Sequence, residues 1–365
     1  MAVPGGDLLW LPRGHWGILI AAYLFLGGLS GGSYLTSVVS SVLFRPRAQG
    51  PEETFACEET SRWGALLGVV AIAIGGVALL SHLGAPLRAL TFPILFSNFG
   101  SWLVIGTWFI VLFAVFATIE AFWLLFGAKH EGEAEGLSYF PRWIVAWIDD
   151  RLPWSDDRGV VRLLDTVADL LRPTGYLRLG VRLVGAFLSV GVIVYTAMLL
   201  TDLASVPFWN RTFMPFIFLM SGASTGISAA LFGTVLSGGG TTRTNHLFCL
   251  ADDGLIVVEI GVLLALLSFL NSGGVAARET FSKLFGSCCY VPFVWGVMAF
   301  GLVLPFLMSM IMTGLVSYTD IEESRLGQVA MSTGFAAKYT LVLLGGFLLR
   351  YVVLSAAVKN PVVVP

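Results

Sequence analysis

The chain has 365 residues, of which 56% are hydrophobic and 12% charged, and its formal net charge at pH 7 is −2. A soluble domain carries about 25% charged residues, so this composition predicts an integral membrane protein. The small net charge argues against a nucleic-acid partner. The cysteines are Cys57, Cys249, Cys288 and Cys289. Because they form no C-x-x-C pair, they indicate buried thiols rather than metal or iron–sulfur ligands.

Apolar runs long enough to cross a bilayer, which takes about 20 residues of helix, occur along the whole chain. Only helices and closed barrels satisfy the backbone in lipid. No run alternates as a barrel strand would, so we expect an all-α integral membrane protein with eight transmembrane helices. The first run is too long for a signal peptide and is predicted to remain as a span. The runs cover approximately residues 17–43, 63–82, 98–127, 178–203, 213–236, 250–270, 291–316 and 336–357.

We expect a single membrane domain, with helices one to three in residues 1–127, a loop in 128–177 and helices four to eight in 178–365. The first four spans would form one bundle and the last four a second. A weak internal similarity favours this division. Phe25–Leu43 and Phe218–Leu236 both begin Phe-Leu, end Val-Leu and carry small residues between, "GGLSGGS" and "MSGASTG". Chance similarity between glycine-rich helices is the alternative.

The distribution of Lys and Arg predicts that both termini lie on the outer side of the cytoplasmic membrane. Loops after odd-numbered spans hold 14 of these residues, when Arg178, Arg182 and Lys338, at the starts of the following runs, are counted with the loops, and the opposite side holds 6. The loop 128–177 accounts for the difference and would be cytoplasmic. Its segment "FPRWIVAWIDDRLPW" is typical of a helix lying in the membrane interface. Such a helix would either dock a partner or cap the bundle.

Polar residues gather toward the outer end of the first four spans. Each has an ordinary structural role as its alternative: a hydrogen bond to a backbone carbonyl, a lipid-headgroup contact, a helix cap, a place in the aromatic belt or a solvated loop acid. Their joint placement predicts a cleft for a small apolar ligand with two polar ends. They are Tyr23, His82, Arg88, Asn98, Ser101, Trp102, Tyr195 and Asp202.

Charged residues also lie within the spans, and Glu120 and Glu259 fall in the predicted cytoplasmic halves of the third and sixth. An intramembrane acid costs several kcal/mol unless it is paired, protonated or hydrated, so Glu120 and Glu259 are functional candidates. Asp252 and Asp253 precede Glu259 and would form an inner entry for protons. Arg350 lies inside the last span and needs a partner. We interpret all five as candidates for proton transfer, with structural hydrogen bonds between helices as the alternative.

The first span has four glycines, Gly27, Gly28, Gly31 and Gly32, where larger apolar side chains would suit lipid better. Glycines at this spacing allow another helix to approach until the two backbones nearly touch. The same glycines serve a rigid bundle with or without a ligand.

Several segments resemble the polysulfide reductase/NrfD-type membrane subunits. The first is "HWGILIAAYLFLGGLSGGSYL" in the opening span, and the second is "SHLGAPLRALTFPILFSNFGSWLVIGTW". The most specific is "VYTAMLLTDLASVPFWNRTFMPFIFLMSGASTGISAAL", and "GGFLLRYVVLSAA" closes the chain. The resemblance thus extends from the first span to the eighth. The sequence departs from the family's "DLGRP" and "YTG" patterns, with His82 and Ala85 in the first and Ala197 in the second.

The resemblance implies a quinone-dependent oxidoreductase subunit that is not the substrate-converting subunit and has no haem or metal of its own. Members bind a quinone, menaquinone or ubiquinone, near the outer face. They exchange electrons with a docked four-cluster ferredoxin-like iron–sulfur subunit, which serves a molybdenum or tungsten catalytic subunit in anaerobic respiration. By this resemblance Tyr195 and Tyr23 are quinone-site residues. His82 occupies the position of an acidic residue of the family that would accept or donate a proton.

Other functions are compatible with parts of the pattern. A haem-b quinol dehydrogenase needs pairs of histidines inside spans, but His15, His130 and His246 lie at ends or in loops and His82 has no partner at its depth. A secondary transporter typically has broken helices and a site at the midplane. A purely structural anchor without a quinone is a third alternative, which only the effect of substitutions such as Tyr195→Phe on turnover would separate.

Overall fold

A computed structural model describes residues 13–82, 99–126, 167–168, 170–171, 175–239, 242–286, 289–318 and 325–359. The regular secondary structure of these residues is helical, with no strand among them, and it includes eight helices long and apolar enough to cross a membrane. The prediction of an all-α protein with eight spans is therefore confirmed. Cys57, Cys249 and Cys289 are buried free thiols.

The first four spans are formed by helices α1, α2, α5 and α8. Helix α1 continues through a short π-helical segment, η2, and a 3-10 turn, η3, before the protein enters α2. Pro51 begins α2 with Glu52 and Glu53 in its first turn, where acids favour a helix start. The bounds are Arg13–Val39 for α1, Ser40–Phe44 for η2, Arg45–Arg47 for η3, Pro51–His82 for α2, Trp102–Leu125 for α5 and Tyr176–Thr201 for α8.

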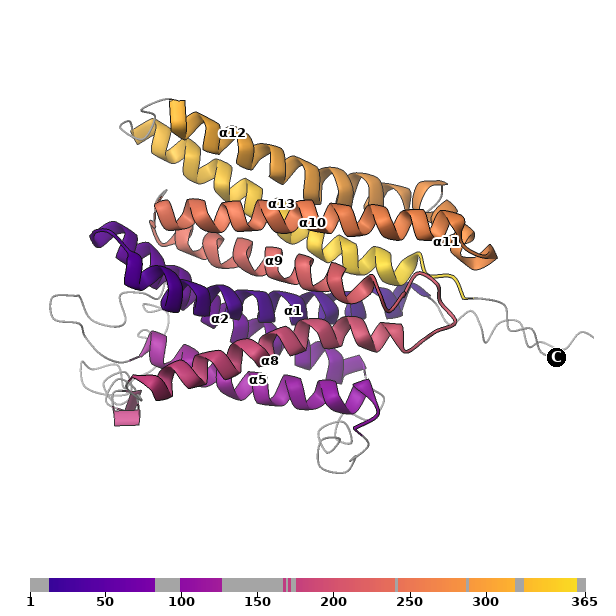
Figure 1. Ribbon diagram of the computed structural model, residues 1–365, viewed down its shortest axis with the longest axis horizontal. Helices are drawn as coiled ribbons and strands as arrows, with labels where there is room; N and C mark the ends of the chain where they lie inside the picture. Colours follow the sequence, from indigo (N-terminus) through magenta and orange to yellow (C-terminus); the bar gives the residue numbers. More distant parts are fainter. Residues whose placement is uncertain are drawn as a thin grey trace, which may run out of the picture.

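The last four spans begin with α9, and a short helix, α11, separates the sixth from the seventh. The seventh span combines a long π-helical segment, η5, with α12. In Figure 1 the helices lie side by side, with α5 and α8 at one edge and α12 and α13 toward the other. The bounds are Met214–Leu236 for α9, Arg243–Ser272 for α10, Val275–Gly286 for α11, Val291–Val303 for η5, Leu304–Tyr318 for α12 and Arg325–Ser355 for α13.

Two helices of the last four spans are longer than their apolar runs predict. Helix α10 begins at Arg243, where the Thr242 side chain accepts a hydrogen bond from the backbone of Asn245, and α13 begins at Arg325. Lys338 therefore lies inside α13 with a fully buried side chain. Counting Lys338 with the preceding loop is wrong, because it lies within the helix and its charge is buried by other helices. The orientation of the termini stays a prediction.

The glycines of α1 lie on two faces of the helix, and each face packs against a different neighbouring helix. Gly31 faces α8, where a Cβ on it would lie 2.6 Å from the carbonyl oxygen of Ser189. Gly32 faces α9, where a Cβ would overlap the carbonyl group of Gly222, and Gly226 meets Gly32 in the same way. The similar stretches of the first and fifth spans thus pack against each other. Only glycine permits this approach between α1 and α9.

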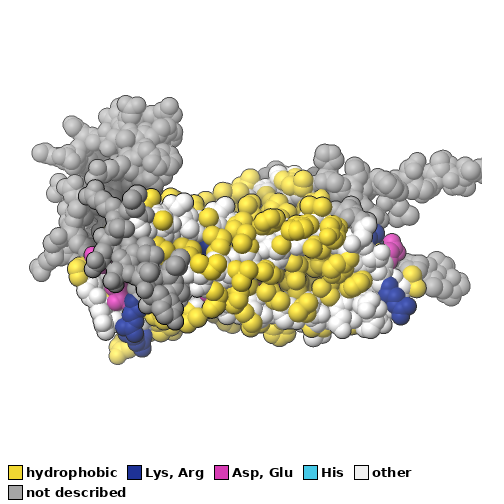
Figure 2. All heavy atoms as spheres, turned by 90° about the horizontal axis from the view of Figure 1, so that it is seen from above, with side chains coloured by type: hydrophobic (Ala, Val, Ile, Leu, Met, Phe, Trp, Pro, Cys, Tyr) yellow, Lys and Arg dark blue, Asp and Glu magenta, His cyan; other side chains and the backbone are white. Residues whose placement is uncertain are grey.

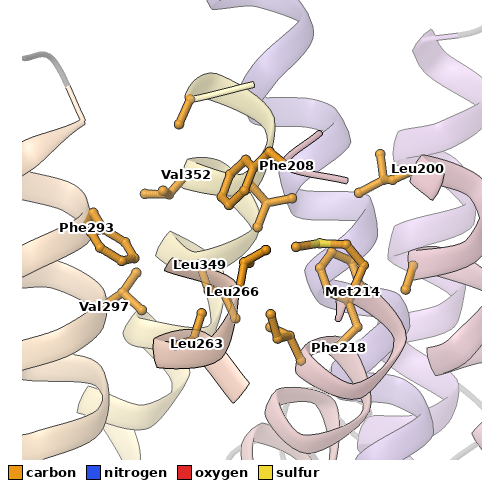
Figure 3. Packing of buried hydrophobic residues seen from close by; sticks show 14 of the residues in the cluster. Leu200, Phe208, Met214, Phe218, Leu263, Leu266, Phe293, Val297, Leu349 and Val352 are labelled. Atoms are coloured by element: carbon orange, nitrogen blue, oxygen red, sulfur yellow. The ribbon is translucent and has the colours of Figure 1, made fainter. Parts of the chain in front are cut away.

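The apolar residues divide between the core and the surface as a membrane protein requires. Figure 2 shows hydrophobic side chains over the middle of the molecule and charged ones mostly at its two ends. Inside, the core between α9, α10, η5 and α13 is packed around Met214, Phe218, Leu266 and Leu349 (Figure 3). Tyr23 and Tyr195 belong to the same cluster of buried residues, so this core continues into the first four spans.

Candidate functional site

A pair of tyrosines joins the first and fourth spans. The hydroxyl of Tyr23, on α1, donates a hydrogen bond to the hydroxyl of Tyr195, on α8, over 3.1 Å. The two side chains are 3% and 2% exposed. A phenol that accepts a hydrogen bond keeps its own proton, so Tyr195 can donate to a further group.

Two other helices complete the surroundings of this pair. The Tyr195 ring lies directly against Gly106 of α5, where a Cβ would overlap it. On the other side, a Cβ on Gly75 of α2 would lie 3.9 Å from the Tyr23 ring. The α1, α2, α5 and α8 helices therefore meet at the tyrosine pair. The structure brings together the two tyrosines that the sequence singled out, near the start of α1 and the end of α8.

The other residues predicted at this end lie at the ends of helices or outside the described residues. His82 is the last residue of α2, and Ser101 and Trp102 start α5 with partly buried side chains. Ser101 is the N-cap residue, but its side chain makes no capping hydrogen bond. Asp202 follows the end of α8 and is exposed. Arg88 and Asn98 lie outside the described residues, as does most of the predicted loop 128–177.

Glu120 is held by two arginines near the opposite end of the first four spans. It lies on α5 and is 1% exposed. One of its carboxylate oxygens accepts a hydrogen bond from Arg182 Nε over 2.7 Å and lies 3.5 Å from Arg178 Nη2. Both arginines were counted with the loop, but they lie in α8. This pairing supports a structural role for Glu120.

The last four spans enclose a cluster of three charged side chains, which we call the lysine triad: Asp252, Asp253 and Lys338. The Lys338 Nζ atom lies 3.2 Å from Asp252 Oδ2 and 3.1 Å from Asp253 Oδ1. Ser224 of α9 donates to Asp252 over 2.5 Å, and Ser309 of α12 donates to Asp253 over 2.6 Å. The triad thus joins four helices. The aspartates lie within α10, not at its end.

Glu259 and Arg350 form a second polar group on the same two helices. Arg350 is fully buried and donates to the Ser221 hydroxyl over 2.5 Å and to the Gly346 carbonyl over 3.1 Å. Ser221 in turn donates to the carboxylate of Glu259, which interacts electrostatically with Arg350. The guanidinium also lies 5.0 Å from the centre of the Phe218 ring, a favourable cation–π distance. These contacts supply the partners that Arg350 needs.

A small cavity lies between these two groups. It is lined by polar residues of α9 and α10, Ser221, Ser224, Thr225 and Glu259, and by small or apolar residues of η5 and α13. Its volume, counted as the space open to the centre of a water molecule, is about 10 Å³, close to the ~10–15 Å³ that one water needs. A second, apolar cavity lies in the core around Met214 and Leu266. Neither cavity is lined by Tyr23 or Tyr195.

Sequence reasoning missed Lys338 and the serines Ser221, Ser224 and Ser309. The adjacent Asp252 and Asp253 contained a signal, because two acids in one turn of a membrane helix require a cation from elsewhere. The described residues contain no group of three or more His, Cys, Asp or Glu side chains placed to hold a metal ion.

Residues 11–361 match the family model described as "Polysulphide reductase, NrfD". A relative from Wolinella succinogenes, named as one of the chains of polysulfide reductase, is 27% identical over 346 residues, which cover 94% of this protein and 93% of that relative. An NrfD homologue from Haemophilus influenzae is 26% identical over 315 residues, covering 84% of this protein and 87% of the homologue. The NrfD protein of Escherichia coli is 27% identical over 296 residues, 80% and 83% of the two proteins.

Proposed function

The chain belongs to the polysulphide reductase NrfD family and is a multi-pass membrane subunit of a redox complex, in which we propose that the Tyr23–Tyr195 pair binds a quinone or quinol. The observation that carries this proposal is the hydrogen bond between two buried phenols on α1 and α8. A phenol buried in a membrane helix costs free energy unless its hydroxyl has a partner. Two phenols that partner each other leave one proton, on Tyr195, free to be donated to a ligand.

The chemistry of a quinone suits this pair. Reduction of a quinone, or oxidation of its quinol, moves two electrons and two protons and places hydrogen-bond acceptors or donors at both ends of the ring. In our proposal Tyr195 binds one of these oxygens, and Tyr23 orients the Tyr195 hydroxyl. We assign the exchange of this proton with the aqueous side to His82 from its place in the sequence, since histidine is the residue type that ordinarily titrates nearest to neutral pH.

The surrounding residues would shape the rest of the site. Ser101 and Trp102 start α5 one turn before Gly106, which contacts Tyr195. We assign Arg88, Asn98 and Asp202 to the rim of the site from their places in the sequence. The ligand would be menaquinone or ubiquinone.

The electrons would pass to or from a docked four-cluster iron–sulfur subunit, and that subunit would serve a molybdenum or tungsten catalytic subunit. The relative from Wolinella succinogenes, whose name marks it as one part of a polysulfide reductase, supports a complex of several subunits. We further propose that the redox step is coupled to proton transfer through the buried groups of α10 and α13, which are Asp252, Asp253, Glu259 and Arg350. Glu120, with its two arginines, supports the fold instead.

The test of the quinone site is the pair of variants Tyr195→Phe and Tyr23→Phe in the assembled complex. Each removes one hydroxyl and keeps the ring. We expect quinol-dependent turnover to fall about tenfold for Tyr195→Phe, since loss of one hydrogen bond of about 1.4 kcal/mol is a factor of ten in rate. Activity with an artificial donor that reduces the iron–sulfur subunit directly should be unchanged.

Tyr34→Phe is the matched control. Tyr34 is also a fully buried tyrosine of α1, but its hydroxyl has no hydrogen-bond partner among the described residues. Its removal should leave quinol turnover as it is. Turnover that stays normal in Tyr195→Phe and Tyr23→Phe would favour a purely structural anchor over a quinone site.

A further inference from the structure

The lysine triad is unbalanced in charge. Asp252 and Lys338 are both 0% exposed, and Asp253 is 9% exposed. The two carboxylates lie 3.2 and 3.1 Å from the same ammonium. If all three groups are ionised, two negative charges face one positive charge, and the triad carries a net charge of −1.

The neighbouring groups that the structure describes do not supply the missing positive charge. Ser224 of α9 and Ser309 of α12 bind the two carboxylates as neutral hydroxyls. Cys249 and Tyr339 lie one turn and one residue away and hydrogen-bond to each other over 3.3 Å. Glu259 and Arg350, the nearest residues of opposite charge toward the other end of α10 and α13, are linked to each other through Ser221.

A net charge at this depth is expensive, because hydrocarbon and packed helices solvate it poorly. One added proton makes the triad neutral. We propose that Asp252, Asp253 and Lys338 form a buried store for a single exchangeable proton, shared by the two carboxyl groups and held in place by the Lys338 ammonium. The proposal deepens, and rests on, the proton-coupling part of the proposed function, but it does not depend on the quinone site.

A route for this proton toward the other end of the bundle is present. Asp252 accepts from Ser224, and Ser224 lines the cavity that also reaches Glu259. Ser224 donates to Asp252 here, so its hydroxyl must first turn toward the cavity. It then takes the carboxyl proton of Asp252 as it gives its own proton to a water in the cavity, and the water passes a proton to Glu259. Ser224 and the water each give up one proton and take one, whereas Asp252 ends as a carboxylate and Glu259 as a neutral carboxyl.

Beyond Glu259 the series of contacts continues through Ser221 to Arg350. From Lys338 to Arg350, α13 rises about 18 Å, and the hydrocarbon core is about 30 Å thick. The Arg350 guanidinium lies against Gly28 of α1, where a Cβ would be 3.0 Å from Nη2. Arg350 thus packs against the helix that carries Tyr23.

The direct test is infrared spectroscopy of the purified full-length protein in lipid, which detects the C=O stretch of protonated carboxyl groups. Each expected result follows from charge balance. The native protein should show one buried protonated carboxyl at neutral pH. Asp252→Asn and Asp253→Asn should each abolish it, because one carboxylate then balances Lys338. Lys338→Met should double it, because two carboxyl groups without a cation both need protons.

Two controls separate this result from other causes. Lys338→Arg keeps the positive charge and should keep the single band. Glu120→Gln removes a buried carboxylate that already has two arginines and should leave the band unchanged. If Lys338→Met fails to fold, the two asparagine variants still decide. A native protein with no such band, or one whose activity requires sodium ions as the balancing charge, would overturn the proposal.

A second experiment shows whether the stored proton is used. In vesicles that contain the whole complex, Asp253→Asn should lower the number of protons translocated per quinol oxidised or quinone reduced to near zero. Failure of the quinone site has a different signature, because Tyr195→Phe should slow turnover and leave the infrared band of the triad intact. Unchanged translocation in Asp253→Asn would reject the relay.

Discussion

Two buried polar regions of this protein stabilise polar side chains away from water in different ways. The tyrosine pair, in the first four spans, is neutral, and one hydrogen bond, from the Tyr23 hydroxyl to that of Tyr195, joins α1 and α8. The lysine triad, in the last four spans, consists of ionisable side chains of α10 and α13, and serines of α9 and α12 donate hydrogen bonds to it. A neutral pair can open to a ligand at the loss of one hydrogen bond. The triad cannot lose its lysine without leaving two buried carboxyl groups that have no cation, so it suits proton storage better than ligand exchange.

The largest effect is expected at the triad. Lys338→Met leaves two buried carboxyl groups without a cation and should lower the free energy of unfolding by about 3–5 kcal/mol, measured by thermal unfolding of the protein in detergent. Adding Asp253→Asn should restore part of the loss. Lys359→Met, at an exposed lysine, is the control and should change stability by less than about 0.5 kcal/mol. Equal effects at the two lysines would remove the distinction between the triad and an ordinary surface charge.

The glycine contact that links the two regions comes next. A Cβ on Gly226 of α9 would overlap the backbone of Gly32 on α1, so Gly226→Ala must push the helices apart and should cost about 1–3 kcal/mol in the same unfolding measurement. Gly76→Ala on α2 adds the same methyl group into open space. Because alanine favours helix, that control should leave stability unchanged or slightly raised. A tolerated Gly226→Ala would show that α1 and α9 need not touch.

The tyrosine pair should give a smaller effect, best isolated by a double-mutant cycle. Tyr23→Phe and Tyr195→Phe should not be additive, and the coupling energy should be about 0.5–1.5 kcal/mol, the net value of one buried hydrogen bond. A parallel cycle of Tyr34→Phe with Tyr195→Phe should be additive, since no hydrogen bond joins those two side chains. Additive effects in both cycles would mean that the pair does not act as a unit.

The smallest effect is expected for an exposed ion pair at the end of the bundle. Lys283 lies 3.6 Å from Glu279, one turn away on α11, with side chains 28% and 54% exposed. Lys283→Ala should lower stability by about 0.3–0.5 kcal/mol at most, and salt should screen even this. A loss comparable with that of Lys338→Met would show that burial is not what makes the triad costly to break.

Much of the fold was predictable from local pattern alone. The eight spans follow from runs of apolar residues, because a bilayer requires a continuous apolar helix of known length. The tyrosine pair was also predictable in part. Tyr23 and Tyr195 lie at similar predicted depth in transmembrane helices, where each hydroxyl needs a hydrogen-bond partner other than water. That each is the partner of the other was not readable, since 172 residues separate them.

The sequence by itself determined the class of protein, the number of spans and the residues whose burial needed an explanation. The tertiary structure alone decided how those residues are paired. It placed Lys338, which the charge count assigns to a loop, inside α13 and against aspartates 85 and 86 residues earlier in the sequence. The physical reason is that hydropathy is summed over neighbours in sequence. The free energy of a buried charge depends on neighbours in space, which helices distant in the sequence supply.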